Sequence, residues 1–305
     1  MPARAYEEIS YVVNNLAGLG AAFSMSLGIF GLVGSEYLPA SLLTPMAVGL
    51  GITEGMAGQA VTVTAVVAVV TSILVSAVIG RIDRRTVLMV FTLLPVLSNL
   101  AVAITPDFTT LLIARVLLGI ALGGFWSLSA VAMMRLVPEP DVPKALAILF
   151  GGVSAATVFA APFGSYFSDL YGWRAVFVAA AGLGVAALVM QWLTLPSKTS
   201  RSSARLGTVF AVLARPGIGL RIFSILLIFA GHFAFFTYLS PFLQGVTQVV
   251  PSGTTLILLL FGIGTFVGNS LRSVLIGRSL RRLCLWACWL SCWLRSVGLP
   301  CSTPS

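Results

Sequence analysis

The chain has 305 residues, of which 58% are hydrophobic and only 9% are charged. A soluble domain carries about 25% charged and about 45–50% apolar residues, so this composition excludes a water-soluble fold. It also excludes a disordered chain, because disordered chains are poor in apolar residues. The sequence therefore predicts a membrane protein, whose excess of Lys and Arg (18 against 9 Asp and Glu) indicates either binding to nucleic acid or orientation in a bilayer.

Eight apolar segments are long enough to cross a bilayer as helices, which takes about 20 residues. In chain order they lie near residues 17–42, 56–79, 86–105, 108–134, 145–167, 174–195, 221–245 and 253–276. The segments are too uniformly apolar for the alternating strands of a membrane barrel, and helices satisfy their own backbone hydrogen bonds in lipid. The predicted fold class is an all-α polytopic membrane protein. Residues 1–15 are polar and show no cleavable signal peptide.

The basic residues fall almost entirely on one side of this predicted topology. That side carries Arg4, Arg81, Arg84, Arg85, Arg135, Lys144, Lys198, Arg201, Arg205, Arg215, Arg221, Arg272, Arg278, Arg281 and Arg282. The opposite loops carry Glu54, Asp107, Asp169 and Arg174. Because Lys and Arg accumulate on the cytoplasmic side, the N-terminus is predicted to be cytoplasmic. The charges orient helices and form no patch with interleaved aromatic residues, so nucleic acid is not expected as a partner.

The same topology divides the chain into four parts. Residues 1–195 form a six-helix transmembrane bundle, residues 196–220 a polar and basic cytoplasmic linker, and residues 221–280 two further helices. Residues 281–305 form a tail of different composition, with Cys284, Cys288, Cys292 and Cys301. Thiols on one helical face suggest a metal or palmitoylation site, but structural zinc sites use closer CxxC pairs. We therefore expect no metal site and interpret the tail as a truncated or frame-shifted end.

Several motifs resemble those of the major facilitator superfamily, in its drug:proton antiporter branch. Arg115 to Gly119 matches RxxxG, the run Ala161 to Ser165 resembles the antiporter signature, and Gly172 to Arg174 reads GWR. Further similar stretches begin at Glu36 (EYLP), Gly123 (GGFW) and Gly231 (GHFAFFTY). The resemblance covers about residues 15–280. It implies an intact N-terminal six-helix bundle and about two helices of the second bundle, where a complete member has two six-helix halves.

This resemblance implies a function in transport. We expect a secondary transporter, not an enzyme, that exports purine ribonucleosides such as inosine or guanosine, or related small molecules, by proton antiport. The alternative is a non-transporting truncated remnant of such a transporter. The expected setting is the bacterial inner membrane, and the expected partners are the small-molecule substrate, protons and lipid, with a monomeric protein and no cofactor. No phosphate-binding loop occurs, so the sequence does not support an ATP-driven pump.

Glu36 and Arg115 are the two charges that fall unmistakably within predicted spans, away from their ends. Such residues are costly in lipid and usually mark a pathway or relay. A carboxyl in a low-dielectric cavity holds its proton more readily than one in water, so Glu36 is the predicted proton carrier, and the resemblance implies that Arg115 couples to it. The alternatives are a glutamate that snorkels to the helix end and an arginine that only satisfies backbone carbonyls.

Aromatic residues and the single histidine suggest a substrate site. Trp126, His232, Phe236 and Tyr238 are the candidates, since aromatic faces stack on purine rings. The alternative is that these side chains only pack against their neighbours. Adjacent residues such as 235 and 236 point to different faces of a helix, so the aromatic residues of this stretch cannot all line one site.

A second group of residues is expected to serve the conformational change. Asp83, Arg84 and Arg85 lie in the loop after the second span, where the family pattern G-x-x-x-D-R-x-G-R-R is only partly matched, and an ordinary basic turn is the alternative. Pro162 and Gly164 are expected to let the fifth span bend. The small-xxx-small spacings Gly119/Gly123 and Gly264/Gly268 predict close helix packing.

Overall fold

The computed structural model describes residues 2–78, 83–195, 218–247 and 249–278. Side chains are described from Gly18 onward within these ranges, except at residues 76–78, 84, 220–221, 251–252 and 268–278. In these ranges the structure has no β-strand. The helices are α1 (Pro2–Ser41), α2 (Leu43–Leu50), α3 (Glu54–Val78), α4 (Arg84–Ala103), α5 (Phe108–Leu136), the short 3-10 helix η1 (Glu139–Asp141), α6 (Val142–Tyr171), α7 (Trp173–Thr194), α9 (Ile218–Gly245) and α10 (Pro251–Arg278). The all-helical prediction is confirmed. The predicted tail, most of the linker and the four cysteines lie outside the described residues.

Within the described ranges, seven helices are long and apolar enough to cross a membrane. They correspond to the first seven predicted spans, which confirms a multi-pass membrane protein. The eighth predicted span coincides with α10, of which the described apolar part is Gly253–Val267. The structure differs in length at two helices: α1 starts at Pro2, well before the predicted boundary at 17, and α6 extends to Tyr171.

The short helix α2 was not predicted as a separate element. Leu42 leaves the helical conformation, with φ of −108° and ψ of 16°, and α2 ends at Gly51, whose φ of +63° is left-handed. Glycine adopts that conformation without steric cost. The Gly51 and Ile52 amides then donate to the Val48 and Ala47 carbonyls, which closes the last turn of α2 in the manner of a C-cap.

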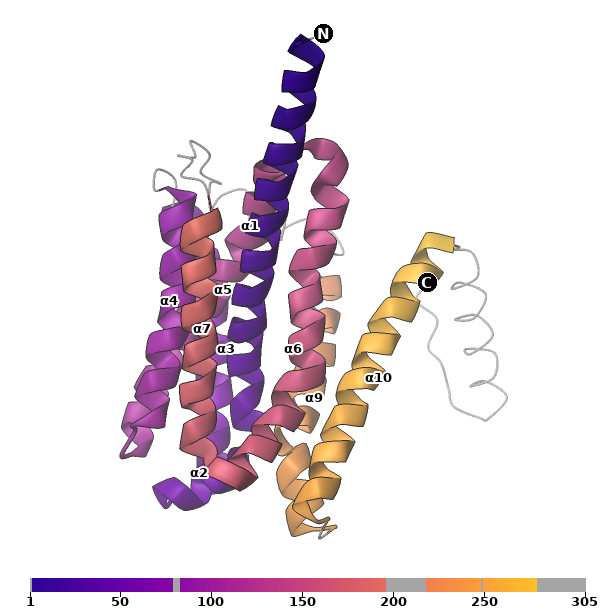
Figure 1. Ribbon diagram of the computed structural model, residues 1–305. Helices are drawn as coiled ribbons and strands as arrows, with labels where there is room; N and C mark the ends of the chain where they lie inside the picture. The colour runs from indigo at the N-terminus through magenta and orange to yellow at the C-terminus, as the bar shows by residue number, and fades with distance from the viewer. Residues whose placement is uncertain (1, 79–82, 196–217, 248, 279–305) are drawn as a thin grey trace, which may run out of the picture.

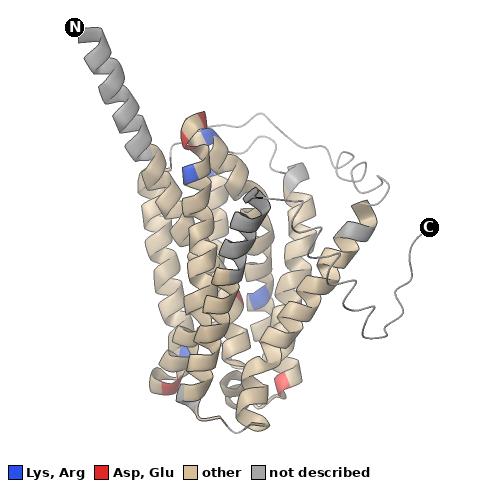
Figure 2. Cartoon of the chain, turned by 90° about the vertical axis from the view of Figure 1, so that its right-hand side faces the viewer, with Lys and Arg blue, Asp and Glu red and all other residues tan. Residues whose placement is uncertain are grey.

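The first six long helices form one bundle (Figure 1). α1 packs against α6 and α7, α5 packs against α3 and α4, and α7 also packs against α4. Most of its charges lie at its two ends (Figure 2). We call the end with Arg85, Arg135 and Lys144 the basic end, and the end with Glu54, Asp107 and Asp169 the acidic end.

α3 and α5 approach closely at two glycines of α5. A Cβ atom at Gly119 would lie 2.7 Å from the Thr64 carbonyl oxygen, and one at Gly123 would lie 2.2 Å from the Ala68 carbonyl oxygen. The predicted Gly119/Gly123 contact is confirmed. The matching prediction is wrong at Gly264, because a Cβ there would meet only open space, and Gly268 lies outside the positions whose surroundings are described.

The close contact of α10 is made instead by Gly262. A Cβ atom at Gly262 would lie 2.7 Å from the Val158 Cα atom of α6 and 3.1 Å from the Val158 carbonyl oxygen. In a regular helix the Val158 carbonyl would accept from the amide of residue 162. Pro162 has no N–H, so the Val158 carbonyl lacks this donor. Pro162 therefore lies where α6 and α10 meet.

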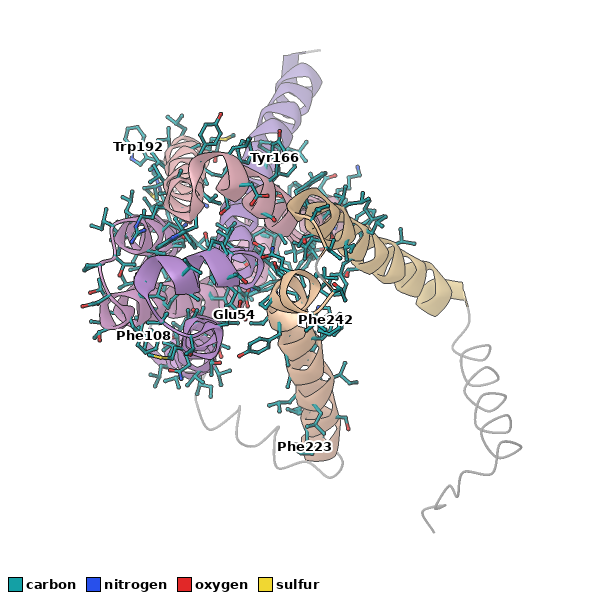
Figure 3. The ribbon with its side chains drawn as sticks, turned by 90° about the horizontal axis from the view of Figure 1, so that it is seen from below. Glu54, Phe108, Tyr166, Trp192, Phe223 and Phe242 are labelled. Carbon is teal, nitrogen blue, oxygen red and sulfur yellow. The ribbon has the colours of Figure 1, made fainter. Side chains whose placement is uncertain are left out.

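α9 and α10 join the bundle at the acidic end and diverge from it toward the basic end (Figures 1 and 3). In the acidic half of α9, Phe236 is only 4% exposed and packs in a cluster with Ala40 and Leu258. In the basic half, Phe223 is 55% exposed and lies at the far tip of the helix in Figure 3, whereas Phe242 lies next to the bundle. α9 therefore contacts the bundle toward the acidic end and stands away from it toward the basic end.

Candidate functional site

The candidate site begins at a break in the hydrogen bonding of α1. Pro39 lies inside this helix and has no N–H to donate to the Ser35 carbonyl, four residues earlier. Arg115 of α5 replaces the missing donor: its Nη1 atom lies 3.0 Å from the Ser35 carbonyl oxygen. Pro39 thus leaves the Ser35 carbonyl without a backbone donor, and the Arg115 guanidinium donates the hydrogen bond instead.

Arg115 is held firmly in the bundle. Its side chain is fully buried, and it is the largest such side chain among the described residues. The guanidinium carbon lies 5.1 Å from the centre of the Phe177 ring of α7, a cation–π contact. The Ser98 hydroxyl donates to the Ala114 carbonyl over 2.7 Å, and the Thr64 hydroxyl, which donates to the Ala60 carbonyl of its own helix over 2.9 Å, also lies 3.4 Å from the Arg115 carbonyl oxygen. Hydroxyls from α3 and α4 thus fix the α5 backbone at this point.

Glu36 follows Ser35 directly and is partly buried. Its carboxylate and the Arg115 guanidinium are near enough to interact electrostatically. In the part of the chain that the structure describes, the two form no ion pair within 4.0 Å. The structure therefore brings the two predicted proton-coupling residues into one region without direct contact.

Two of the four predicted substrate residues lie beside this region. Tyr37 of α1 packs edge-on against Phe236, with ring centres 5.0 Å apart, and stacks on Phe233 at 6.1 Å. His232 stacks on Phe261 of α10, with ring centres 5.7 Å apart. The aromatic contact of Tyr37 with α9 was not predicted from the sequence.

The other two predicted substrate residues lie elsewhere. Trp126 is 40% exposed and stacks on Phe150 of α6 at 6.2 Å, which is its ring contact among the described residues. Tyr238 is half exposed, and a Cβ atom at Gly58 of α3 would lie 2.8 Å from its hydroxyl. The structure therefore does not gather all four candidates into one cluster.

The predicted conformational residues hold helices together. Asp83 caps α4, its carboxylate accepting from the Arg85 amide at 3.1 Å, and the Arg85 side chain donates to the Trp192 carbonyl of α7. The Arg84 side chain lies outside the described residues. On α6, Pro162 is buried, and a Cβ atom at Gly164 would lie 2.7 Å from Leu38 of α1.

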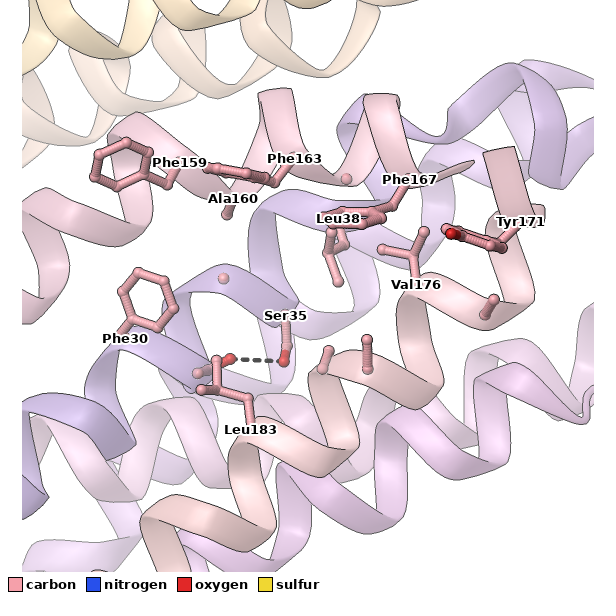
Figure 4. Close-up of a pocket in the computed structure, with 16 residues that line it drawn as sticks. Phe30, Ser35, Leu38, Phe159, Ala160, Phe163, Phe167, Tyr171, Val176 and Leu183 are labelled. Atoms are coloured by element: carbon pink, nitrogen blue, oxygen red, sulfur yellow. Dashed lines mark hydrogen bonds between the residues drawn. The ribbon is translucent and has the colours of Figure 1, made fainter. Parts of the chain in front are cut away.

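A large pocket of about 730 Å³ lies between α1, α6 and α7. A column of rings from α6, comprising Phe159, Phe163, Phe167 and Tyr171, forms one wall of it (Figure 4). Its lining is almost wholly apolar, and it includes none of the four predicted substrate residues. A purine ribonucleoside needs several hydrogen-bond partners, which this pocket does not offer.

A more polar pocket of about 460 Å³ lies at the acidic end, between the bundle and α9. Its walls include Ser165 and Asp169 of α6, Trp173 of α7 and Gln244 of α9. Ser165 and Gln244 can both donate and accept hydrogen bonds, the Trp173 indole can donate, and the ionised Asp169 carboxylate can accept. Among the described residues, no group of three or more His, Cys, Asp or Glu side chains could hold a metal ion.

The sequence matches one family model and a set of named proteins. The model of the Major Facilitator Superfamily matches residues 21–305. The chain is 48% identical over 261 residues to the purine ribonucleoside efflux pump NepI of Escherichia coli O6:K15:H31 (strain 536 / UPEC), a match that covers 86% of this chain and 66% of that protein. The protein of the same name from Shigella sonnei (strain Ss046) is 47% identical over the same length. The chain thus spans slightly less than two thirds of the length of these curated relatives.

Solved structures of transporters share the fold. A bacterial homolog of the human lysosomal transporter Spinster, in an inward-facing and unoccupied conformation, matches with a TM-score of 0.65 and 18% identity, covering 87% of this chain and 64% of that one. A D-xylose–proton symporter matches with a TM-score of 0.62 and 15% identity, covering 85% and 69%. At these identities the likeness shows a common fold.

Proposed function

The chain belongs to the Major Facilitator Superfamily, and we propose that it exports purine ribonucleosides or related small molecules. The observation that carries this proposal is the 48% identity, over 86% of the chain, to proteins named as purine ribonucleoside efflux pumps. Its relatives are transporters, and the chain is accordingly a transporter rather than an enzyme. The chain spans 66% of the length of those relatives.

Proton antiport is the energy source that we propose. Glu36 is a carboxyl in the membrane core with part of its surface accessible, and the buried charge of Arg115 lies nearby. Without a fixed ion pair, Glu36 can exchange a proton as access to it changes. Arg115 stabilises the ionised form of the carboxyl, so that loss of the proton is not prohibitively costly in this environment.

Substrate would enter from the cytoplasm. The basic end is the cytoplasmic end by the distribution of Lys and Arg, and α9 and α10 diverge from the bundle toward that end (Figure 1). In the acidic half of the bundle, Tyr37 packs against Phe236 of α9, where the pathway would be closed. Release would then require these two rings to separate.

Transport by the full-length protein in inverted membrane vesicles tests this proposal. We expect labelled inosine to accumulate when the vesicle lumen is acidic, and a protonophore to abolish that accumulation. Glu36→Gln should fold and insert normally but lose the dependence on the proton gradient, whereas Glu36→Asp should retain part of it.

Two outcomes would contradict the proposal. Accumulation by Glu36→Gln equal to that of the unaltered protein would exclude Glu36 as the proton carrier. No accumulation by a well-folded unaltered protein would favour the second candidate, a chain that inserts without transporting.

We also propose that the protein is monomeric. Light-scattering mass measurement in detergent tests this.

A further inference from the structure

A buried polar cluster centred on Ser35 joins three helices. The Ser35 hydroxyl accepts from Asn99 Nδ2 of α4 over 2.7 Å and donates to the Gly31 carbonyl over 2.7 Å. The Ser35 carbonyl accepts from Arg115 of α5 over 3.0 Å. Asn99 and Arg115 are therefore anchored on the same residue of α1, and both are almost completely buried.

This cluster has more hydrogen-bonding capacity than the protein satisfies. Four buried side-chain atoms in the described part of the chain have no protein partner, and three of them belong to Asn99 and Arg115: Asn99 Oδ1, Arg115 Nε and Arg115 Nη2. An unmade hydrogen bond at a buried polar atom is costly, and buried polar groups are therefore nearly always paired, often with internal water. A partner for these three atoms would come from outside the chain.

The chemistry of the three atoms selects the partner. Two are donors that carry positive charge, and the third is a neutral carbonyl acceptor. A halide ion would satisfy the two donors but leave Asn99 Oδ1 unpaired. A water molecule accepts from Arg115 and donates to Asn99, so it can satisfy both kinds of atom.

We propose that internal water binds between Asn99 and Arg115, and that Asn99 is a positioning residue for proton coupling. This inference rests on the proposed function for its second part. Through Ser35 and the bound water, Asn99 keeps Arg115 on the α1 backbone beside Glu36, at a separation that allows electrostatic attraction without an ion pair. The proton affinity of Glu36 then depends on Asn99, although the two residues need not touch.

The other charged and titratable groups around Glu36 are few. Tyr37 is its neighbour on α1, and His232 on α9 lies against Phe233 and Phe261. The described charges of α3, α4, α6 and α7 lie at the helix ends. Arg115 is therefore the charge through which a change at Asn99 would affect Glu36.

A high-resolution structure tests the water site without any transport assay. At better than about 2 Å, where ordered water is resolved, we expect density within hydrogen-bonding distance of Arg115 Nη2 or Nε and of Asn99 Oδ1. A crystal soaked in bromide gives the discriminating result. An anomalous bromide peak at this position, or no density there, would overturn the proposal of bound water.

Two variants of Asn99 test its positioning role. Asn99→Asp offers Arg115 a competing carboxylate, so the pH at which transport is half-maximal should rise by about one unit. Asn99→Leu removes both amide atoms at similar volume and should lower transport at least fivefold with a nearly unchanged melting temperature. Thr92→Val is the matched control, because Thr92 is another buried polar residue of α4 that bonds to Gln191 outside the cluster.

The outcomes separate this inference from the proposed function. An unshifted pH midpoint in Asn99→Asp, or a shift of the same size in Thr92→Val, would overturn the positioning role. If the unaltered protein transports nothing, the proposed function and the positioning role both fail, but the water site is still decided by the structure.

Discussion

Arg115 donates to the carbonyl oxygen of Ser35, the acceptor that Pro39 leaves free in α1. The contact joins α1 to α5 in the membrane core and places a buried cation next to Glu36. A lysine could supply the charge, but it lacks the planar guanidinium that lies over the Phe177 ring while donating to this carbonyl. Ser35, Pro39 and Arg115 therefore act as one unit.

Pro39→Ala tests this unit. The new backbone N–H would compete with Arg115 for the Ser35 carbonyl, and a hydrogen bond of this kind is worth about 0.5–1.5 kcal/mol. We expect a melting temperature that is unchanged or higher, and proton-driven inosine uptake that falls about two- to tenfold. The control is Pro95→Ala, which alters another buried proline inside a helix, α4. Equal effects of the two variants on uptake would show that the Arg115 contact is irrelevant.

Close packing of α3 and α5 gives a prediction for stability. A Cβ atom at Gly123 would lie 2.2 Å from a backbone oxygen, which cannot move aside without shifting the helix. Gly123→Ala should therefore destabilise the protein by about 1–3 kcal/mol, the usual cost of overpacking. Gly151→Ala on α6 is the matched control, since a Cβ there has no neighbour within 4 Å. Thermal unfolding in detergent compares the two, and a Gly123→Ala protein as stable as the control would contradict the packing.

The start of α5 should be sensitive to acid. Asp107 caps this helix, its carboxylate accepting from the Thr110 amide over 2.7 Å. This backbone hydrogen bond, followed by one from the Thr110 side chain, lowers the pKa of Asp107. A lowered pKa means that its contribution to stability is complete above the unfolded value of about 3.9 and is lost as the pH falls through the folded value.

Asp107→Ser separates the cap from the charge. Serine keeps an oxygen that accepts at the helix N-terminus, so we expect a small loss of stability at pH 7. The difference between the two proteins should shrink below about pH 4. Melting temperatures measured across pH check this, and a constant difference down to pH 2 would contradict the role of the ionised carboxylate.

The sequence identified the charged part of the site but not its polar support. Glu36 and Arg115 stand out because charges are rare in apolar helices, and the structure brings them into one region; their role in proton coupling stays a prediction. Ser35 and Asn99 are uncharged, so composition gave them little weight. The proline four residues after Ser35 was the available signal, since it predicts a free carbonyl. The sequence could not predict that Trp126 and Tyr238 lie away from the other substrate candidates. Which neighbour a residue in a helix faces depends on how the helices pack together.

Closure at the acidic end gives the last prediction. The Thr255 hydroxyl of α10 donates to the Ser165 hydroxyl of α6 over 3.4 Å, so thiols at these positions could approach within the reach of a disulfide. In a background with Cys284, Cys288, Cys292 and Cys301 replaced by serine, oxidation of the Ser165→Cys/Thr255→Cys protein should hold the acidic end closed. Inosine uptake into inverted vesicles should then fall to background and recover on reduction, while each single variant is unaffected by oxidant. Full uptake by a completely cross-linked protein would mean that α6 and α10 need not separate there, and the route of release would have to lie elsewhere.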